Sequence, residues 1–162
     1  MTRQVAAISV PPVLAHTFPG TAAQAAVARH WVQAAAARMA GPDAADLAEL
    51  AVSELFTNAL RHSRSGRPGG TITVIITCGP DGVTVHVHDQ GAAGGVVPRP
   101  RDAGDEAESG RGLLIVQELS AAWGTRPGAE CSDADAGRPA AGSGRCAWFA
   151  CPPGNREGGR RT

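Results

Sequence analysis

The stretch that decides the fold of this chain runs from residue 52 to residue 62 and reads Val52-Ser53-Glu54-Leu55-Phe56-Thr57-Asn58-Ala59-Leu60-Arg61-His62. It lies inside a longer segment, from about Asp43 to Ser63, in which apolar residues recur at helical spacing. Glu54 and Asn58 are four residues apart, so on a helix they are neighbours at the border of the apolar stripe and should face a cleft. A carboxylate can accept a proton, and an amide oxygen suits a hard cation such as Mg²⁺. Taken alone, the two residues are more often ordinary polar positions at a helix edge.

The residues before this stretch predict two further elements, a short edge strand over residues 14–18 and a helix from about residue 21 to residue 40. Gly41-Pro42-Asp43 closes that helix and caps the next one. In the two helices we expect these residues at core spacing: Val27, Trp31, Ala34 or Ala35, Leu47, Leu50, Ala51 and Leu55.

The residues after this stretch predict a β-hairpin. Two runs rich in β-branched residues, 71–78 and 83–89, flank the turn Gly79-Pro80-Asp81-Gly82. A flexible Arg/Gly/Ser linker over residues 63–70 is expected to join the hairpin to the helix. Further along, the pattern predicts a helix over about residues 113–122, a strand over 123–126 and a final strand over 145–151, separated by polar loops.

Asp89 ends the second strand of this hairpin. Period-two alternation places it on the face shared by the three valines of that strand, and a carboxylate on an apolar face needs a partner. A strand-terminating turn residue is the alternative interpretation. His86 and His88 point the other way, and because no third ligand is apparent we interpret them as a solvent-facing or interface pair, not a metal site.

The composition excludes several kinds of phosphate chemistry, because none of the 162 residues is a lysine. A Walker A loop, the lysine of eukaryotic-type kinases and Schiff-base catalysis are therefore ruled out. The formal net charge is zero, so no global field attracts nucleic acid or an anionic membrane. No apolar run has the length of a membrane span and the start lacks a signal peptide, so we expect a cytoplasmic protein with no membrane partner.

The chain has four cysteines, at positions 78, 131, 146 and 151. They form no C-x-x-C pair, and no histidine lies at zinc-finger spacing from them. Buried or incidental thiols are the first interpretation, with a disulfide or a metal site as alternatives.

Three features occur in a fixed order. A helix bears Glu54 and Asn58, a strand ends in Asp89-Gln90-Gly91, and a long loop ends in Gly110-Arg111-Gly112 before a helix. In this order they resemble the N box, G1 box and G2 box of the GHKL ATPase superfamily, which includes gyrase, heat-shock chaperone, histidine-kinase and mismatch-repair ATPase domains. The likeness is strongest to bacterial anti-sigma-factor serine/threonine protein kinases and covers about residues 14–150. It rests on the segments 52–62, 110–116, Trp123-Gly124 and Trp148-Phe149.

This resemblance implies an α/β fold, a two-layer sandwich of the Bergerat (histidine-kinase-like ATPase) type. Its sheet would be mixed but mainly antiparallel, with helices on one face. The domain would span residues 13–151, between a flexible N-terminus over 1–12 and a disordered tail over 152–162. Residues 92–110 would form an ATP lid that nucleotide orders.

The resemblance also implies a role for each matching residue. Glu54 would be catalytic and deprotonate the attacking hydroxyl, and Asn58 would bind both the cofactor and Mg²⁺. Asp89 would accept a hydrogen bond from the adenine amino group, and Gly91 would leave room for the base. The end of the lid would close on the phosphates through Gly110, Arg111, Gly112 and Leu113. Loop punctuation by the two glycines and a solvated Arg111 are the alternatives.

Two segments depart from the pattern of the relatives. Many of them carry a lysine or threonine just before the final aromatic strand, whereas Gly144-Arg145-Cys146-Ala147-Trp148 offers no hydroxyl. Asp89-Gln90-Gly91 is followed by Ala92-Ala93, not by the extended D-x-G-x-G of sensor histidine kinases. The chain also has no room for the phosphoacceptor domain of those kinases, so a sensor kinase is not expected.

The function implied by the resemblance is that of an ATP–Mg²⁺-dependent protein serine/threonine kinase. Its partners would be a sigma factor and/or an anti-anti-sigma (STAS-type) protein that it phosphorylates, and a homodimer is compatible with the family. One alternative is a non-catalytic interaction module that uses ATP only to set its shape. Another is a nucleotide-free regulatory protein that keeps the boxes as scaffold. Direct nucleic-acid binding is not expected.

Overall fold

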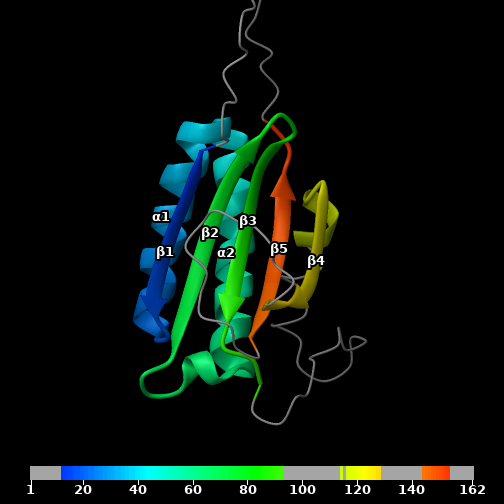
Figure 1. Cartoon of the computed structure of the whole chain (residues 1–162). Helices are drawn as coiled ribbons and strands as arrows, with labels where there is room; N and C mark the ends of the chain where they lie inside the picture. Colours follow the sequence, from blue (N-terminus) through cyan, green and yellow to red (C-terminus); the bar gives the residue numbers. More distant parts are fainter. Residues whose placement is uncertain (1–11, 93–113, 115, 129–143, 154–162) are drawn as a thin grey trace, which may run out of the picture.

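The computed structural model describes residues 12–92, 114, 116–128 and 144–153 (Figure 1). Helix α1 (Ala22–Ala40) precedes α2 (Pro42–His62), and α2 is followed by the short 3-10 helix η1 (Arg64–Gly66). The strands are β1 (Val13–Pro19), β2 (Thr71–Gly79), β3 (Gly82–Asp89), β4 (Ala122–Pro127) and β5 (Arg145–Cys151). Residues 114 and 116–119 are also helical.

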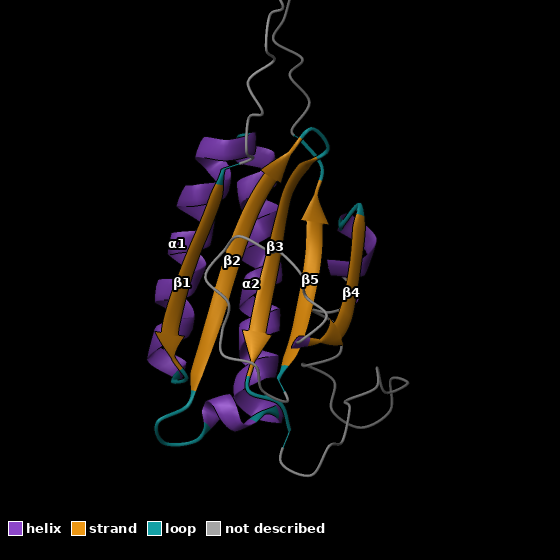
Figure 2. Ribbon diagram, in the orientation of Figure 1, coloured by secondary structure: helices purple, strands orange, loops and turns teal. Residues whose placement is uncertain are grey.

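The strands form one five-stranded sheet in the order β1-β2-β3-β5-β4. All four pairings between the described strands are antiparallel. Helices α1 and α2 lie side by side and cover one face of this sheet (Figures 1 and 2). The predicted two-layer α/β sandwich with helices on one face is therefore confirmed.

The predicted hairpin is confirmed as β2 and β3. Gly79 lies opposite Gly82, and the two residues between them, Pro80 and Asp81, make the turn. Gly82 has a φ of 111°, a value that residues with a Cβ rarely adopt, which explains a glycine at this corner. The strands predicted over 14–18, 123–126 and 145–151 are confirmed as β1, β4 and β5. The helix predicted to reach residue 122 ends at Leu119, because β4 begins at Ala122.

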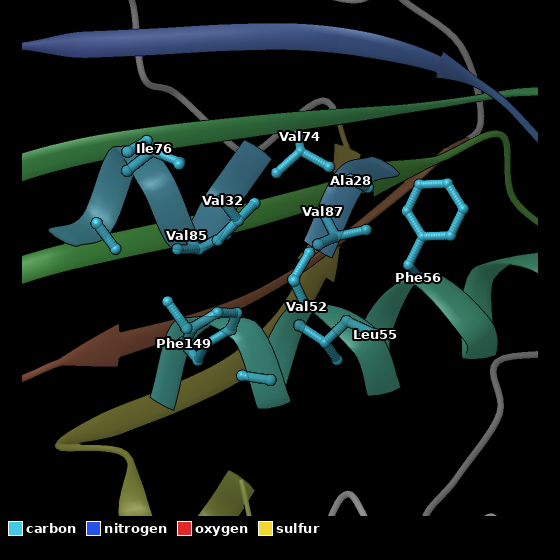
Figure 3. Packing of buried hydrophobic residues seen from close by; sticks show 14 of the residues in the cluster. Ala28, Val32, Val52, Leu55, Phe56, Val74, Ile76, Val85, Val87 and Phe149 are labelled. Carbon is cyan, nitrogen blue, oxygen red and sulfur yellow. The ribbon is translucent and has the colours of Figure 1, made fainter. Parts of the chain in front are cut away.

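The core fills the space between the helix pair and the sheet (Figure 3). From α2 it takes Ala44, Ala45, Ala48, Ala51, Val52, Leu55, Phe56 and Ala59. Ala51 and Leu55 match the sequence prediction, whereas the predicted Leu47 and Leu50 are only half-buried. The buried face of α2 is rotated from the predicted one toward Val52 and Phe56. The side chains of these two residues pack against the sheet.

The predicted face of α1 is correct only in part, because Ala35 is buried and Trp31 packs against the core but Val27 does not. Val27 is 51% exposed, and the residues that α1 buries are Ala28, Val32, Ala35 and Ala36. This helix is rich in alanine and apolar on nearly every side, so spacing alone does not select the face that packs.

Residues 63–70 are not the flexible linker that the sequence suggests. Ser65 is fully buried, and the backbone N–H of Gly20 donates to the carbonyl of Gly70 over 2.8 Å. A Cβ on Gly20 would lie 1.6 Å from the carbonyl oxygen of Ser65, so this close approach requires glycine. The glycines of this segment allow tight packing between backbones here.

The histidine pair on β3 is not exposed to solvent. His86 and His88 are 6% and 7% exposed, and Nδ1 of His86 lies 3.7 Å from Sγ of Cys146 on β5. The prediction of a solvent-facing pair is therefore wrong. Among the described residues no group of three potential metal ligands occurs, and Cys78 and Cys151 are free thiols. Within this same part of the chain, no helix is long and apolar enough to cross a bilayer.

Candidate functional site

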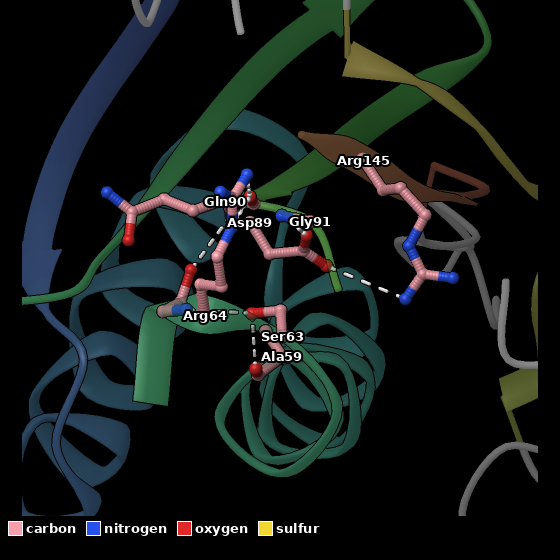
Figure 4. A network of polar contacts seen from close by, with 8 residues as sticks. Ala59, Ser63, Arg64, Asp89, Gln90, Gly91 and Arg145 are labelled. Carbon is pink, nitrogen blue, oxygen red and sulfur yellow. Dashed lines mark hydrogen bonds and ion pairs between the residues drawn. The ribbon is translucent and has the colours of Figure 1, made fainter. Parts of the chain in front are cut away.

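Asp89 is the last residue of β3, and its side chain is 10% exposed. Oδ1 accepts a hydrogen bond of 2.6 Å from the backbone N–H of Gly91. Oδ2 lies 3.9 Å from Nη2 of Arg145, the first residue of β5 (Figure 4). The chain thus supplies one hydrogen-bond donor and one nearby positive charge for this largely buried carboxylate, which needs polar partners.

Gly91 bends the chain directly after β3. Its φ of 76° lies in the left-handed region, where a side chain is strained. The bend brings its N–H back onto the carboxylate of Asp89 two residues earlier, which orients that carboxylate locally. Gly91 therefore has a backbone role in the site, and room for a base beside it stays a prediction.

The C-terminal end of α2 is tied to the residues that follow β3. Arg64 donates from Nη2 to the carbonyl of Gln90 over 2.8 Å, and its backbone N–H donates to the carbonyl of Gly91 over 2.8 Å. The hydroxyl of the buried Ser65 accepts a hydrogen bond of 2.9 Å from the N–H of Gln90. These bonds hold residues 89–91 against the end of the helix (Figure 4).

Glu54 and Asn58 lie one turn apart on α2, and both are half-buried at the edge of its packed face. Asn58 is one turn from His62, where α2 ends, and this is the end that is hydrogen-bonded to residues 89–91. The fold therefore brings Asn58 and Asp89 to the same end of the sandwich. Within the part of the chain that the structure describes, no hydrogen bond or ion pair occupies the side chains of Glu54 and Asn58.

The third predicted box is not among the described residues. Gly110, Arg111, Gly112 and Leu113, and the predicted lid over 92–110 apart from Ala92, lie outside them. Their contribution to the site stays a prediction.

The described site fits a magnesium ion only if a phosphate ligand supplies further oxygens. Asn58 offers one amide oxygen, and none of the described residues joins it in a cluster of three metal-ligating acidic, histidine or cysteine side chains. Mg²⁺ often binds through one or two protein oxygens, with phosphate oxygens and water completing the octahedron. The residues present are therefore compatible with a metal that arrives with a phosphate ligand.

Three residues of this polar network have no predicted role in the sequence. Arg64 and Ser65 lie in the segment that the sequence predicts to be a linker. Arg145 lies in the segment that lacks the hydroxyl found in many relatives, and the sequence suggests no role for it. Arg145 is the Cα partner of Asp89 in the β3–β5 ladder, a relation that depends on strand register. The one local signal is Ser63-Arg64-Ser65 directly after a helix, a composition typical of hydrogen-bonded turns.

The fold and this site define a class of protein. The pattern of the histidine kinase-like ATPase domain family matches residues 18–133, which is most of the chain. The chain belongs to this family. The match agrees with the α/β sandwich, and it includes both α2 and the end of β3.

A characterised relative gives a second, finer likeness. The chain is 34% identical over 80 residues to the serine-protein kinase RsbW of Listeria monocytogenes. The similar region covers 44% of this chain and 51% of that kinase. The chain thus spans about half the length of the relative that it matches.

Proposed function

We propose that this chain is an ATP–Mg²⁺-binding regulatory protein of the cytoplasm, a serine/threonine kinase of the anti-sigma type. Its substrate would be a serine of an anti-anti-sigma (STAS-type) partner, with a sigma factor as a second partner. Membership in an ATPase domain family supports ATP as the ligand. Similarity to a serine-protein kinase supports a protein hydroxyl as the phosphoryl acceptor.

The observation that supports the proposal most strongly is the meeting of two elements at one end of the sandwich. Helix α2, with Glu54 and Asn58, ends where Asp89 closes β3, and hydrogen bonds from η1 hold the two ends together. This arrangement supports the proposed roles of Asp89 in base recognition and of Glu54 and Asn58 in phosphate chemistry.

In the proposed mechanism Asp89 accepts a hydrogen bond from the amino group of adenine, and Asn58 would hold a magnesium ion through its amide oxygen. The metal neutralises charge on the phosphates when it is bound. Glu54 accepts the proton of the substrate hydroxyl as the serine oxygen bonds to the γ-phosphorus. The bond from that phosphorus to the β–γ bridging oxygen breaks, and ADP leaves. Lid residues 92–110 would close over the phosphates, with Gly110, Arg111, Gly112 and Leu113 at their end.

A phosphotransfer assay with radiolabelled ATP and candidate STAS proteins tests this function. Glu54→Gln keeps the size of the side chain but cannot accept the proton, so transfer should fall about 10²–10⁴-fold. Binding of ATP–Mg²⁺, measured by calorimetry, should remain within a few fold of the unaltered protein, because Glu54 contacts the reacting hydroxyl and not the nucleotide base.

Glu49→Gln is the matched control for this experiment. Glu49 lies on the same helix, but its carboxylate accepts a hydrogen bond from Gln33 and pairs with Arg29 of α1. Transfer should therefore be unchanged in this variant. ATP-dependent capture of the partner with no transfer would instead support a non-catalytic module. If ATP–Mg²⁺ does not bind, or binds as well to Asn58→Ala and Asp89→Ala, the proposal is wrong.

A further inference from the structure

Arg145 is a charged residue at the inner side of the sheet. Along β5 the side chains of Phe149 and Cys151 are fully buried on the helix-facing side, and period-two alternation continues this side to Arg145. Its side chain is 22% exposed. An arginine in such a position needs acceptors for its five N–H donors, because an unsatisfied buried donor is destabilising.

The described residues satisfy only a small part of this requirement. Nη2 of Arg145 lies 3.9 Å from Oδ2 of Asp89, which is a loose ion pair and longer than a hydrogen bond. Nε of Arg145 is buried, and within the described part of the chain it has no hydrogen-bond partner. The guanidinium group therefore retains donors beside the carboxylate that the proposed function assigns to adenine.

The backbone at this point is firmly placed. Arg145 pairs with Asp89 on one side and with Pro127 of β4 on the other. The preceding Gly144 accepts a 2.8 Å hydrogen bond from the N–H of Gly128, and a Cβ on Gly144 would lie 2.3 Å from the carbonyl oxygen of Asp89. A fixed backbone keeps the guanidinium close to Asp89, so its position is not that of a freely moving surface arginine.

We propose that Arg145 is a second base-reading residue, which donates a hydrogen bond to a purine ring nitrogen while Asp89 accepts one from the exocyclic amino group. In adenine, N1 and N7 are acceptors that lie on either side of the exocyclic amino group. A carboxylate next to a guanidinium presents the complementary arrangement of acceptor and donor. The inference rests on the proposed ATP function and adds a specificity-determining residue to it.

The test compares ATP with analogues that lack one recognition atom each, by calorimetry or competition with Mg²⁺ present. The probes are 1-deaza-ATP, 7-deaza-ATP and purine riboside triphosphate, which lacks the amino group. The unaltered protein should bind one of the two deaza analogues about tenfold more weakly than ATP, the loss expected for one charge-assisted hydrogen bond. Arg145→Met should bind ATP about tenfold more weakly and should no longer distinguish that analogue from ATP.

Arg126→Met is the matched control. Arg126 lies on β4 with its guanidinium carbon 5.3 Å from the ring of Trp148, and its Cα partner on β5 is Cys146. This variant should keep both the affinity for ATP and the deaza discrimination. Arg145→Lys keeps the charge without the planar fork and should lose much of the discrimination, which provides a second variant if Arg145→Met does not fold.

Two results would overturn the inference. One is an Arg145→Met protein that binds ATP as tightly as the unaltered protein or more tightly. The other is a deaza discrimination that is absent from the unaltered protein or retained in both Arg145 variants. A third result separates this inference from the proposed function. If purine riboside triphosphate binds more weakly than ATP to the unaltered protein but not to Asp89→Ala, while the Arg145 variants bind all the nucleotides as the unaltered protein does, only this inference fails. If the unaltered protein binds no nucleotide, the proposed function fails with it.

Discussion

Strands β3 and β5 face the helices with four pairs of residues, of which three are apolar and the fourth is charged. The apolar pairs are Val83 with Cys151, Val85 with Phe149, and Val87 with Ala147, and the charged pair is Asp89 with Arg145. All four follow from the same alternation along the same ladder. The apolar pairs pack against the helices (Figure 3), whereas the charged pair lies where α2 ends and η1 begins. One continuous face is thus apolar along most of its length, and the residues proposed to bind the nucleotide base lie at one end of it.

Among substitutions in these four pairs, the largest loss of stability is expected in the apolar pairs. Phe149 is fully buried, so Phe149→Ala should lower the free energy of unfolding by about 3–5 kcal/mol. Arg145→Met in the charged pair should change it by about 1 kcal/mol or less, because a loose, partly exposed ion pair contributes little. Urea unfolding of both variants measures the contrast. Equal losses would show that the charged pair is structural.

A smaller effect is expected at the junction that holds the charged end in place. Ser65→Ala removes the acceptor for the N–H of Gln90 and should lower the free energy of unfolding by about 1–2 kcal/mol. It should also weaken ATP binding, because residues 89–91 lose a contact to η1. Ser53→Ala is the control. Among the described residues the Ser53 hydroxyl donates only to the carbonyl of Glu49 within α2, so its removal should be nearly neutral. If Ser65→Ala lowers stability but leaves ATP affinity unchanged, the contact between Ser65 and Gln90 does not contribute to ATP binding.

The smallest expected effect is a pH dependence in the first apolar pair. Burial raises the pKa of Cys151 from 9.0 to about 12. Below pH 9 the thiol is neutral in both folded and unfolded chains; above it the unfolded chain releases the proton first, so stability is lost as pH rises toward 12. Between pH 8 and pH 10 the unaltered protein should lose about 1 kcal/mol more than Cys151→Ala. Denaturant titrations at the two values measure this, and identical losses would contradict a buried neutral thiol.

Elements with a strong local signal could be predicted from the sequence. The β2–β3 hairpin follows from its glycine-rich turn and β-branched runs, and the α2 helix follows from its apolar spacing. The packed side of α1 could be predicted only in part, because an alanine-rich helix offers several similar faces. The burial of His86 and His88 could not be predicted either, since strand alternation gives a direction but not what covers a face.

The candidate site divides in the same way. Neighbouring positions for Glu54 and Asn58 follow from helical periodicity, and the inward direction of Asp89 follows from strand periodicity. The contacts of Arg64 and Ser65 with Gln90 join residues 25 or 26 positions apart, which no local pattern encodes. The roles assigned to these residues in nucleotide chemistry stay predictions that the proposed assays test.

The sequence by itself determined the sandwich, the family and the order of the boxes, because these depend on short-range periodicity and on motifs that can be read along the chain. Only the tertiary structure decided what stands next to Asp89. The pairing with Arg145 arises from the register of two strands separated by more than fifty residues in sequence, and register is set by packing across the whole sheet. In the sequence, the segment before the last strand is notable for lacking a hydroxyl. In the fold, the same segment places the guanidinium of Arg145 beside the carboxylate of Asp89.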